Sequence, residues 1–149
     1  MKIAVLGYGT VGSGVVEVLD VNQKLIASRA KEEIEVKYVL DLRNFPGDKI
    51  QEKIVHDYEI ILNDPEIGIV VEVMGGVEPA NTFVRKALEA GKSVVTSNKA
   101  LVAKHGSALL KTAREKNVNF LFEASVGGGI PILRALGSSL TGDEIEEIA

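Results

Sequence analysis

The sequence predicts an α/β domain built on a doubly wound parallel sheet. Short runs rich in β-branched residues alternate with longer segments of helical periodicity along the chain, as is typical of βαβ units. In addition, Ile67–Val73 is almost entirely apolar, as expected of a parallel strand covered on both faces. The 149 residues are enough for one domain with a sizeable core.

The first half of the chain is expected to contain two strands and two helical segments. A strand is expected at Lys2–Leu6, and a helix follows from Thr10 to about Ala30. Within that helix the residues that recur at helical spacing are Val11, Val15, Val18/Leu19, Asn22 and Ile26. The second strand is expected at Ile34–Leu40, followed by a turn over residues 44–47. A short helical segment is expected at Asp57–Leu62.

The second half continues the alternation, beginning with the strand at Ile67–Val73. A helix is expected from Pro79 to Ala90, with Pro just inside its start and Gly91 just past its end. The remaining expected elements are a strand at Ser93–Thr96, a helix at Lys99–Lys116 with an interruption at Gly106 left open, a strand at Val118–Phe122, and a helix from about Ile130 to Leu136. Residues 144–149 alternate like the beginning of a strand.

Composition argues against several classes of protein. The formal net charge is −4 and the chain has no basic tract, which argues against nucleic acid or an anionic membrane as a partner. The absence of cysteine excludes disulfides, thiolate metal sites and cysteine nucleophiles. No apolar run approaches the ~18 residues of a membrane span, and the first residues lack the pattern of a signal peptide. We therefore expect a cytoplasmic protein.

The most specific local pattern is G-x-G-x-x-G, formed by Gly7, Gly9 and Gly12 between the first strand and the first helix. Gly7 allows a tight turn, Gly9 leaves room for a pyrophosphate, and Gly12 lets the helix lie close to the sheet. The N–H groups near Thr10 and Val11 would face the phosphates at the positive end of the helix dipole. The pattern predicts a Rossmann-type dinucleotide-binding domain, and a merely structural turn is the alternative.

Ligands of such a sheet bind outside the carboxyl ends of its strands. The candidate site therefore comprises the residues that follow each strand: Gly7–Gly12, Asp41–Arg43, Met74–Gly76, Ser97–Lys99 and Glu123–Gly129. The cofactor choice is ambiguous at the second of these segments. Asp41 suits the ribose 2′-OH of NAD, whereas Arg43 suits the 2′-phosphate of NADP. Either side chain could instead be a solvated loop charge.

Three further segments resemble those of homoserine dehydrogenases. Glu72–Ala80 resembles their E-V-M-G-G-x-x-P-A segment, and Gly91–Leu101 resembles their G-K-x-V-V-T-x-N-K-A-L segment. Phe122–Ile132 is similar to their F-E-A-S-V-x-G-G-I-P-I segment, although position 127, often Ala in the family, is Gly here. Together with Gly7–Gly12, these segments extend over the whole chain.

The resemblance implies a reversible reduction of L-aspartate 4-semialdehyde to L-homoserine with NAD or NADP as cofactor. It places Lys99 at the nicotinamide edge, where its ammonium could polarise a carbonyl or hold a carboxylate. A solvated surface lysine is the alternative. The residues expected to contact the cofactor are Gly7, Tyr8, Gly9, Thr10, Val11, Gly12, Asp41, Arg43, Met74, Gly75, Gly76, Thr96, Ser97, Asn98 and Lys99.

The resemblance also implies a monovalent cation, such as Na⁺, in the loop after the last strand. Its ligands would be the Glu123 side chain and oxygens of Val126, Gly128 and Ile130, since hard oxygen ligands suit such an ion. A Glu bonded to nearby backbone N–H groups is the equal alternative. Glu72, within a buried strand, is expected to have a structural hydrogen-bonding role. His56 and His105 are assigned no role.

Family members carry a second domain that binds substrate, forms the dimer and holds the usual acid/base Lys and Asp. We therefore expect residues 1–142 to be the dinucleotide-binding domain and residues 143–149 to begin a missing substrate domain. The chain alone is expected to be inactive, and the full-length enzyme to be a homodimer acting on a small-molecule substrate. The alternatives are another NAD(P)-dependent dehydrogenase of an amino-acid pathway, such as one acting on aspartate, or a non-catalytic NAD(H)-sensing module.

Overall fold

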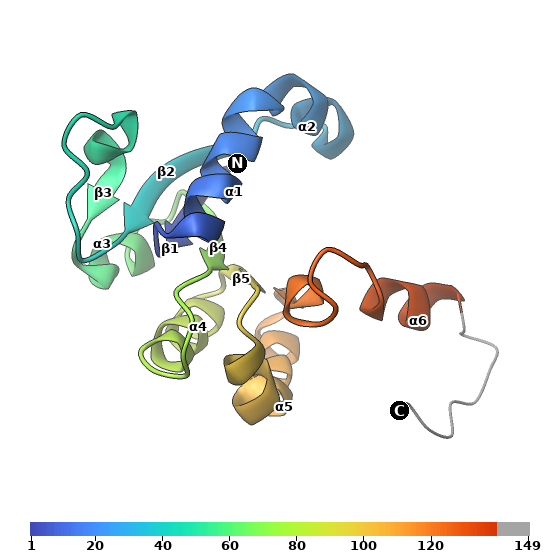
Figure 1. Cartoon of the computed structure of the whole chain (residues 1–149). Coiled ribbons are helices and arrows are strands. Elements are labelled where there is room, and N and C mark those ends of the chain that lie inside the picture. The colour runs from blue at the N-terminus through green and yellow to red at the C-terminus, as the bar shows by residue number, and fades with distance from the viewer. Residues whose placement is uncertain (140–149) are drawn as a thin grey trace.

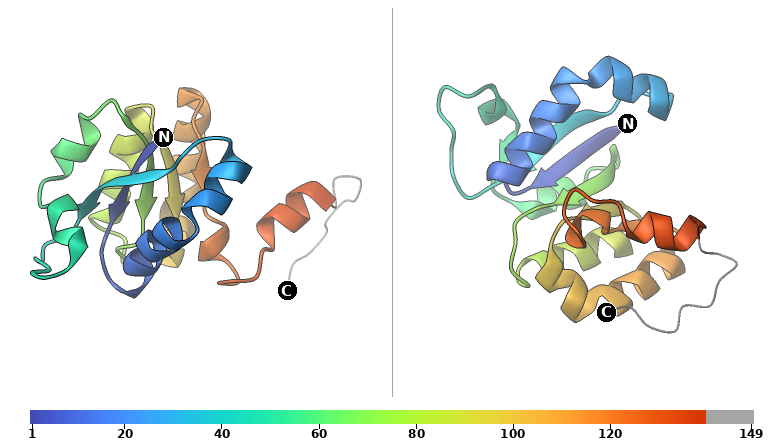
Figure 2. Two further views of the ribbon diagram at one scale, coloured as in Figure 1. Left: turned by 90° about the horizontal axis from the view of Figure 1, so that it is seen from above. Right: turned by 45° about the vertical axis from the view of Figure 1, so that its right-hand side comes forward.

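The computed structural model describes residues 1–139 and consists of one parallel sheet with helices on both faces (Figures 1 and 2). The six strands lie in the order β3-β2-β1-β4-β5-β6. Their bounds are β1 Lys2–Leu6, β2 Glu35–Leu40, β3 Ile54–Val55, β4 Ile67–Glu72, β5 Ser93–Thr96 and β6 Phe120–Leu121. This is the strand order of a dinucleotide-binding sheet, with its reversal between β1 and β4. The fold class predicted from the sequence is confirmed.

The helices divide the core into two parts. They are α1 Thr10–Val21, α2 Gln23–Ala30, α3 Tyr58–Leu62, α4 Ala80–Glu89, α5 Lys99–Lys116 and α6 Leu133–Ser139, with 3₁₀ turns at Lys49–Lys53 and Glu123–Ser125. On one face, α1 packs over β1 and β2 around buried Val5, Val16 and Val39. The opposite face is covered by α3, α4 and α5. Within residues 1–139 no helix combines the length and apolar character needed to cross a bilayer.

The helices expected within residues 1–139 are confirmed, and their main differences from expectation are as follows. The helix expected from Thr10 to Ala30 is two helices, because Asn22 leaves the helical conformation (φ −102°, ψ 17°) and α2 has no buried residue that would hold it in line with α1. The last helix begins at Leu133 instead of Ile130, since Pro131 disfavours a helical residue before it. Pro79 is the N-cap of α4, and buried Gly106 does not interrupt α5.

Among the strands, the main differences concern the last strand and an additional short strand. The last strand is shorter than expected because Asn117, in the left-handed conformation (φ 54°), ends α5 and the Val118 N–H bonds back to the Ala113 carbonyl. The two-residue strand β3, which pairs with Val39 and Leu40 of β2, was not expected from the sequence. The proposed boundary at residues 142 and 143, and the strand expected at 144–149, lie outside the described residues.

Candidate functional site

The turn between β1 and α1 has the geometry that its glycines predict. Gly7 has a φ of +99° and its N–H donates to the Leu40 carbonyl at 2.8 Å. A Cβ on Gly12 would lie 1.9 Å from the Gly7 carbonyl oxygen, whereas a Cβ on Gly9 would meet nothing within 4 Å. Gly9 is the N-cap of α1, and no side chain caps this helix. The first turn of α1 therefore opens onto free space that suits an anion.

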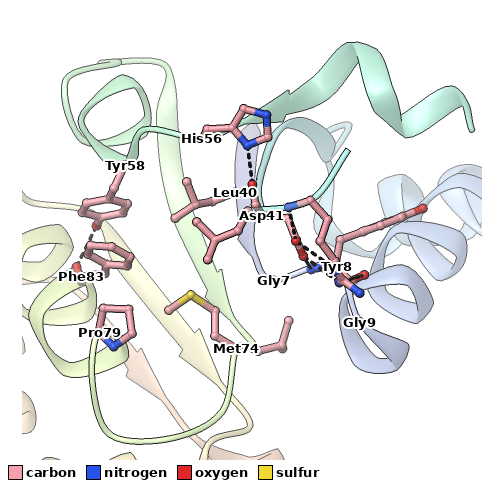
Figure 3. A pocket seen from close by; sticks show the side chains of 13 residues that line it. Gly7, Tyr8, Gly9, Leu40, Asp41, His56, Tyr58, Met74, Pro79 and Phe83 are labelled. Carbon is pink, nitrogen blue, oxygen red and sulfur yellow. Dashed lines mark hydrogen bonds and ion pairs between the residues drawn. The ribbon is translucent and has the colours of Figure 1, made fainter. Parts of the chain in front are cut away.

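A pocket of about 480 Å³ adjoins this turn at the carboxyl ends of β1, β2 and β4 (Figure 3). Its size is that of a small-molecule site. Apolar side chains form most of its wall, and Asp41, Arg43 and His56 supply polar groups at one side. The full lining consists of Gly7, Tyr8, Gly9, Leu40, Asp41, Leu42, Arg43, His56, Tyr58, Val73, Met74, Pro79 and Phe83.

Asp41 and Arg43, the two residues expected to read the cofactor, bind each other. Arg43 Nε and Nη2 donate to the two Asp41 carboxylate oxygens at 3.0 Å each. Asp41 also accepts the Tyr8 N–H at 2.8 Å, and Arg43 Nη2 donates to the Tyr8 carbonyl at 3.0 Å. The pair thus holds the Tyr8 backbone from both sides. Hydrogen bonds from Arg43 keep the pKa of Asp41 well below its usual range.

The side chains of Asp41 and Arg43 differ in solvent exposure, and this difference limits the role that each can have. The Asp41 side chain is only 9% exposed, so it is not a solvated loop charge, while the Arg43 side chain is 61% exposed. Arg43 also lies over the Phe45 ring, 5.0 Å from its centroid. An exposed guanidinium at the rim of the pocket is available to an anionic ligand, provided that it exchanges its contact with Asp41 for the new one.

His56, Tyr58 and Phe83 are among the pocket residues that sequence reasoning missed. His56 Nδ1 lies 2.6 Å from the Asp41 carbonyl oxygen and its Nε2 lies 3.1 Å from Asn44 Oδ1. The rings of Tyr58 and Phe83 stack at 4.3 Å between centroids and form another wall. The pairing of β3 with β2 brings His56 beside Asp41, and no sequence pattern marks a two-residue strand.

The loops after β4 and β5 form the other half of the site. Gly75 and Gly76 have φ values of +79° and +73°, and Lys99 is exposed at the first position of α5. The side chains of Thr96 and Asn98 are buried and donate to the carboxylate of Glu72. The structural hydrogen-bonding role expected of Glu72 is confirmed.

The loop expected to hold a cation shows the alternative hydrogen bonds. Glu123 Oε1 accepts the Leu133 N–H at 2.8 Å and Oε2 accepts the Arg134 N–H at 3.0 Å. Val126, Gly128 and Ile130 lie on the same exposed loop. No group of three His, Cys, Asp or Glu side chains that could hold a metal occurs among residues 1–139. A cation would therefore depend on backbone carbonyls and on the remaining lone pairs of Glu123.

Comparisons with known proteins agree with this geometry. A family model described as the NAD-binding domain of homoserine dehydrogenase matches residues 7–123. The homoserine dehydrogenase of Pseudomonas aeruginosa is 43% identical over 150 residues, which is 100% of this chain and 35% of that protein. The crystal structure of a homoserine dehydrogenase from Thiobacillus denitrificans has a TM-score of 0.87 at 41% identity, covering 96% of this chain and 34% of that one.

A more distant structure, a hyperthermophilic archaeal homoserine dehydrogenase in complex with NADPH, has a TM-score of 0.75 at 24% identity. It covers 91% of this chain and 47% of that one, and at this identity it supports the fold alone. The chain spans about a third of the length of the curated relatives it matches.

Proposed function

The chain belongs to the homoserine dehydrogenase family through its NAD-binding domain, and we propose that it is the cofactor-binding part of an enzyme that interconverts L-aspartate 4-semialdehyde and L-homoserine. The observation that carries the proposal is the uncapped first turn of α1, open at Gly9 and continuous with the pocket at the carboxyl edge of the sheet. Such a crevice binds dinucleotides at the point where the strand order reverses.

The two halves of the site are proposed to have different roles in binding the cofactor and the substrate. The pyrophosphate is proposed to lie at Gly9–Val11, the adenosine in the apolar pocket, and the nicotinamide toward Gly75, Gly76 and Lys99. NAD(P)H supplies the hydride when bound, while the protein orients it and sets the electrostatics. Lys99 is proposed to stabilise negative charge on the substrate with its exposed ammonium. The remaining acid/base groups are proposed to come from parts of the enzyme outside these 149 residues.

Arg43 and Asp41 are proposed to set the preference between NADP and NAD. The exposed guanidinium of Arg43 supports a role toward a 2′-phosphate, and the position of Asp41 at the end of β2 supports a role toward a 2′-hydroxyl.

Na⁺ is proposed to bind in the loop after β6. Its ligands would be the carboxylate of Glu123 and backbone oxygens of Val126, Gly128 and Ile130. A rise in the thermal midpoint with NaCl, absent with tetramethylammonium chloride at equal ionic strength, would support this cation site.

We further propose that the full-length enzyme is a homodimer located in the cytoplasm. The reaction draws on a cellular pool of NAD(P)H, which supports the location. Size-exclusion chromatography with light scattering on the full-length enzyme tests the oligomeric state.

Titration of the chain with NADH and with NADPH, followed by the fluorescence of the reduced nicotinamide, tests cofactor binding. Saturable binding of at least one of the two is the expected result. Absence of binding by a folded chain would overturn the assignment. Oxidation of homoserine by the full-length enzyme tests the activity itself.

A further inference from the structure

Glu72, at the end of β4, is a fully buried carboxyl group that the proposed reaction does not use directly. Oε1 accepts the Met74 N–H at 2.9 Å and an N–H of the Asn98 amide at 3.4 Å, while Oε2 accepts the Thr96 hydroxyl. Burying a carboxylate costs more free energy than burying an apolar side chain of similar size, unless hydrogen bonds compensate. Here the compensating donors come from the loops after β4 and β5, so the group joins these two loops.

Asn98 bonds both to the loop after β4 and to the first turn of α5. Its Nδ2 donates to the Gly76 carbonyl at 2.6 Å, and its Oδ1 accepts the Leu101 N–H at 3.1 Å as the N-cap of α5. Its own N–H donates to Thr96 Oγ1 at 3.0 Å. The start of α5, with its positive dipole end, therefore lies against the Glu72 carboxylate. Lys99 is the next residue along the chain, so this network fixes where its backbone lies.

We propose that Glu72 is a positioning residue that acts through Asn98 on Lys99 and on the Met74–Gly76 loop. The inference rests on the proposed function, in which the nicotinamide and the substrate lie between these two segments. Because Glu72 is fully buried, we expect it to contact neither ligand. Its contribution is to hold the Lys99 ammonium where charge develops on the substrate oxygen, since an error of about 1 Å in such a placement costs on the order of 100-fold in rate.

The test is Glu72→Gln in the full-length enzyme. Glutamine keeps the size of the side chain but replaces one carboxylate oxygen with an NH₂ group, which donates and does not accept. Either the hydrogen bond from the Thr96 hydroxyl at Oε2 or the pair from the Met74 N–H and the Asn98 amide at Oε1 is therefore lost. We expect kcat for homoserine oxidation to fall by about tenfold or more while the Kd for NADPH or NADH changes less than about twofold. Ile67→Val is the matched control, because Ile67 is buried in the same strand but at its amino end, away from the proposed site. It is expected to lower the thermal midpoint and leave kcat unchanged.

A double-mutant cycle separates positioning from a general loss of packing. If Glu72 acts through Lys99, Glu72→Gln has little further effect on kcat in enzyme that already carries Lys99→Ala. Losses that multiply independently would overturn the inference. The same cycle with Asn98→Ser provides a second route, should Glu72→Gln fail to fold. Serine caps a helix as asparagine does but is too short to reach the Gly76 carbonyl.

Failure of the proposed function and failure of the positioning role of Glu72 give different experimental results. Wild-type enzyme that fails to oxidise homoserine would overturn the proposed function and, with it, this inference. Active wild-type enzyme whose Glu72→Gln variant keeps the wild-type kcat would overturn the inference alone.

Discussion

Gly9 and Gly12 belong to the same motif but are constrained by different neighbours. Gly12 faces its own protein, since a Cβ there would collide with the Gly7 carbonyl oxygen. Gly9 faces open space, which is where the phosphates are proposed to bind. The requirement for glycine is therefore structural at position 12 and ligand-dependent at position 9.

Gly9→Val is expected to weaken binding of NADH and NADPH by about 3 kcal/mol, roughly 100-fold in Kd, because its side chain occupies the space of the pyrophosphate. The fold should persist, so circular dichroism and the thermal midpoint should stay close to wild type. Gly12→Ala is the contrasting variant, and it is expected to lower the free energy of unfolding by about 1–3 kcal/mol through overpacking. Undiminished cofactor affinity in folded Gly9→Val protein would contradict the assignment of this turn.

Arg43→Ala is expected to weaken binding of NADPH more than that of NADH. A charge-assisted hydrogen bond to the 2′-phosphate contributes about 1.5–3 kcal/mol, and part of this gain is offset because Arg43 must leave Asp41. The two Kd values, measured by fluorescence titration, provide the comparison. Arg29→Ala, on the exposed helix α2, is the control that should change neither. Equal losses for both cofactors would show that Arg43 does not read the 2′-position.

At the scale of elements, the sequence predicts what local patterns encode and misses what distant segments build. β-branched runs locate β1, β4 and β5, and the glycine pattern locates the turn before α1. The break at Asn22 depends on α2 having nothing to pack against, which no local pattern reports. Likewise, His56, Tyr58 and Phe83 become pocket walls only because β3 and α4 come together beside β2 and β4.

One ion-pair cluster joins elements that local patterns do not connect. Lys37 on β2 binds the carboxylates of Asp64 and Glu66, which lie in the turn before β4. Asp64 Oδ1 also accepts the Glu66 N–H at 2.8 Å. The pKa of Asp64 is lowered from 3.8 to about 2, mainly by the hydrogen bond from Lys37 and to a smaller extent by the one from the Glu66 N–H.

Because the folded pKa of Asp64 lies below its unfolded value, its contribution to stability is present above about pH 4 and is lost as the pH falls toward about 2. Asp64→Asn should therefore flatten the decline of the free energy of unfolding over this interval. Urea unfolding at a series of pH values measures the effect. Asp20→Asn, on the exposed side of α1, controls for the change in net charge. An unchanged acid dependence in Asp64→Asn would contradict the role of this pair.

At the scale of the molecule, the carboxyl edge of the sheet has two halves of different chemical character. The half built from β1 to β3 carries the apolar pocket with Asp41 and Arg43, and the half built from β4 to β6 carries Lys99 and the Glu72 network. The first half suits binding of a cofactor. The second half carries one exposed cation, Lys99, whose backbone lies at the start of α5 beside the Glu72 network.

The 149-residue chain is therefore expected to bind NADH or NADPH but to show negligible oxidation of homoserine. Reduction of the aldehyde requires a group within hydrogen-bond reach of the developing alkoxide and walls that hold the aldehyde beside the nicotinamide. Lys99 is the one such candidate among residues 1–139 that the motifs identify, and a single ammonium cannot provide both. In the full-length enzyme, Lys99→Ala should lower kcat/KM by about 100-fold or more while changing the cofactor Kd little, since its charge is needed mainly in the transition state. Robust turnover by the isolated chain, or a Lys99→Ala enzyme that loses cofactor affinity instead of kcat, would refute this division of roles.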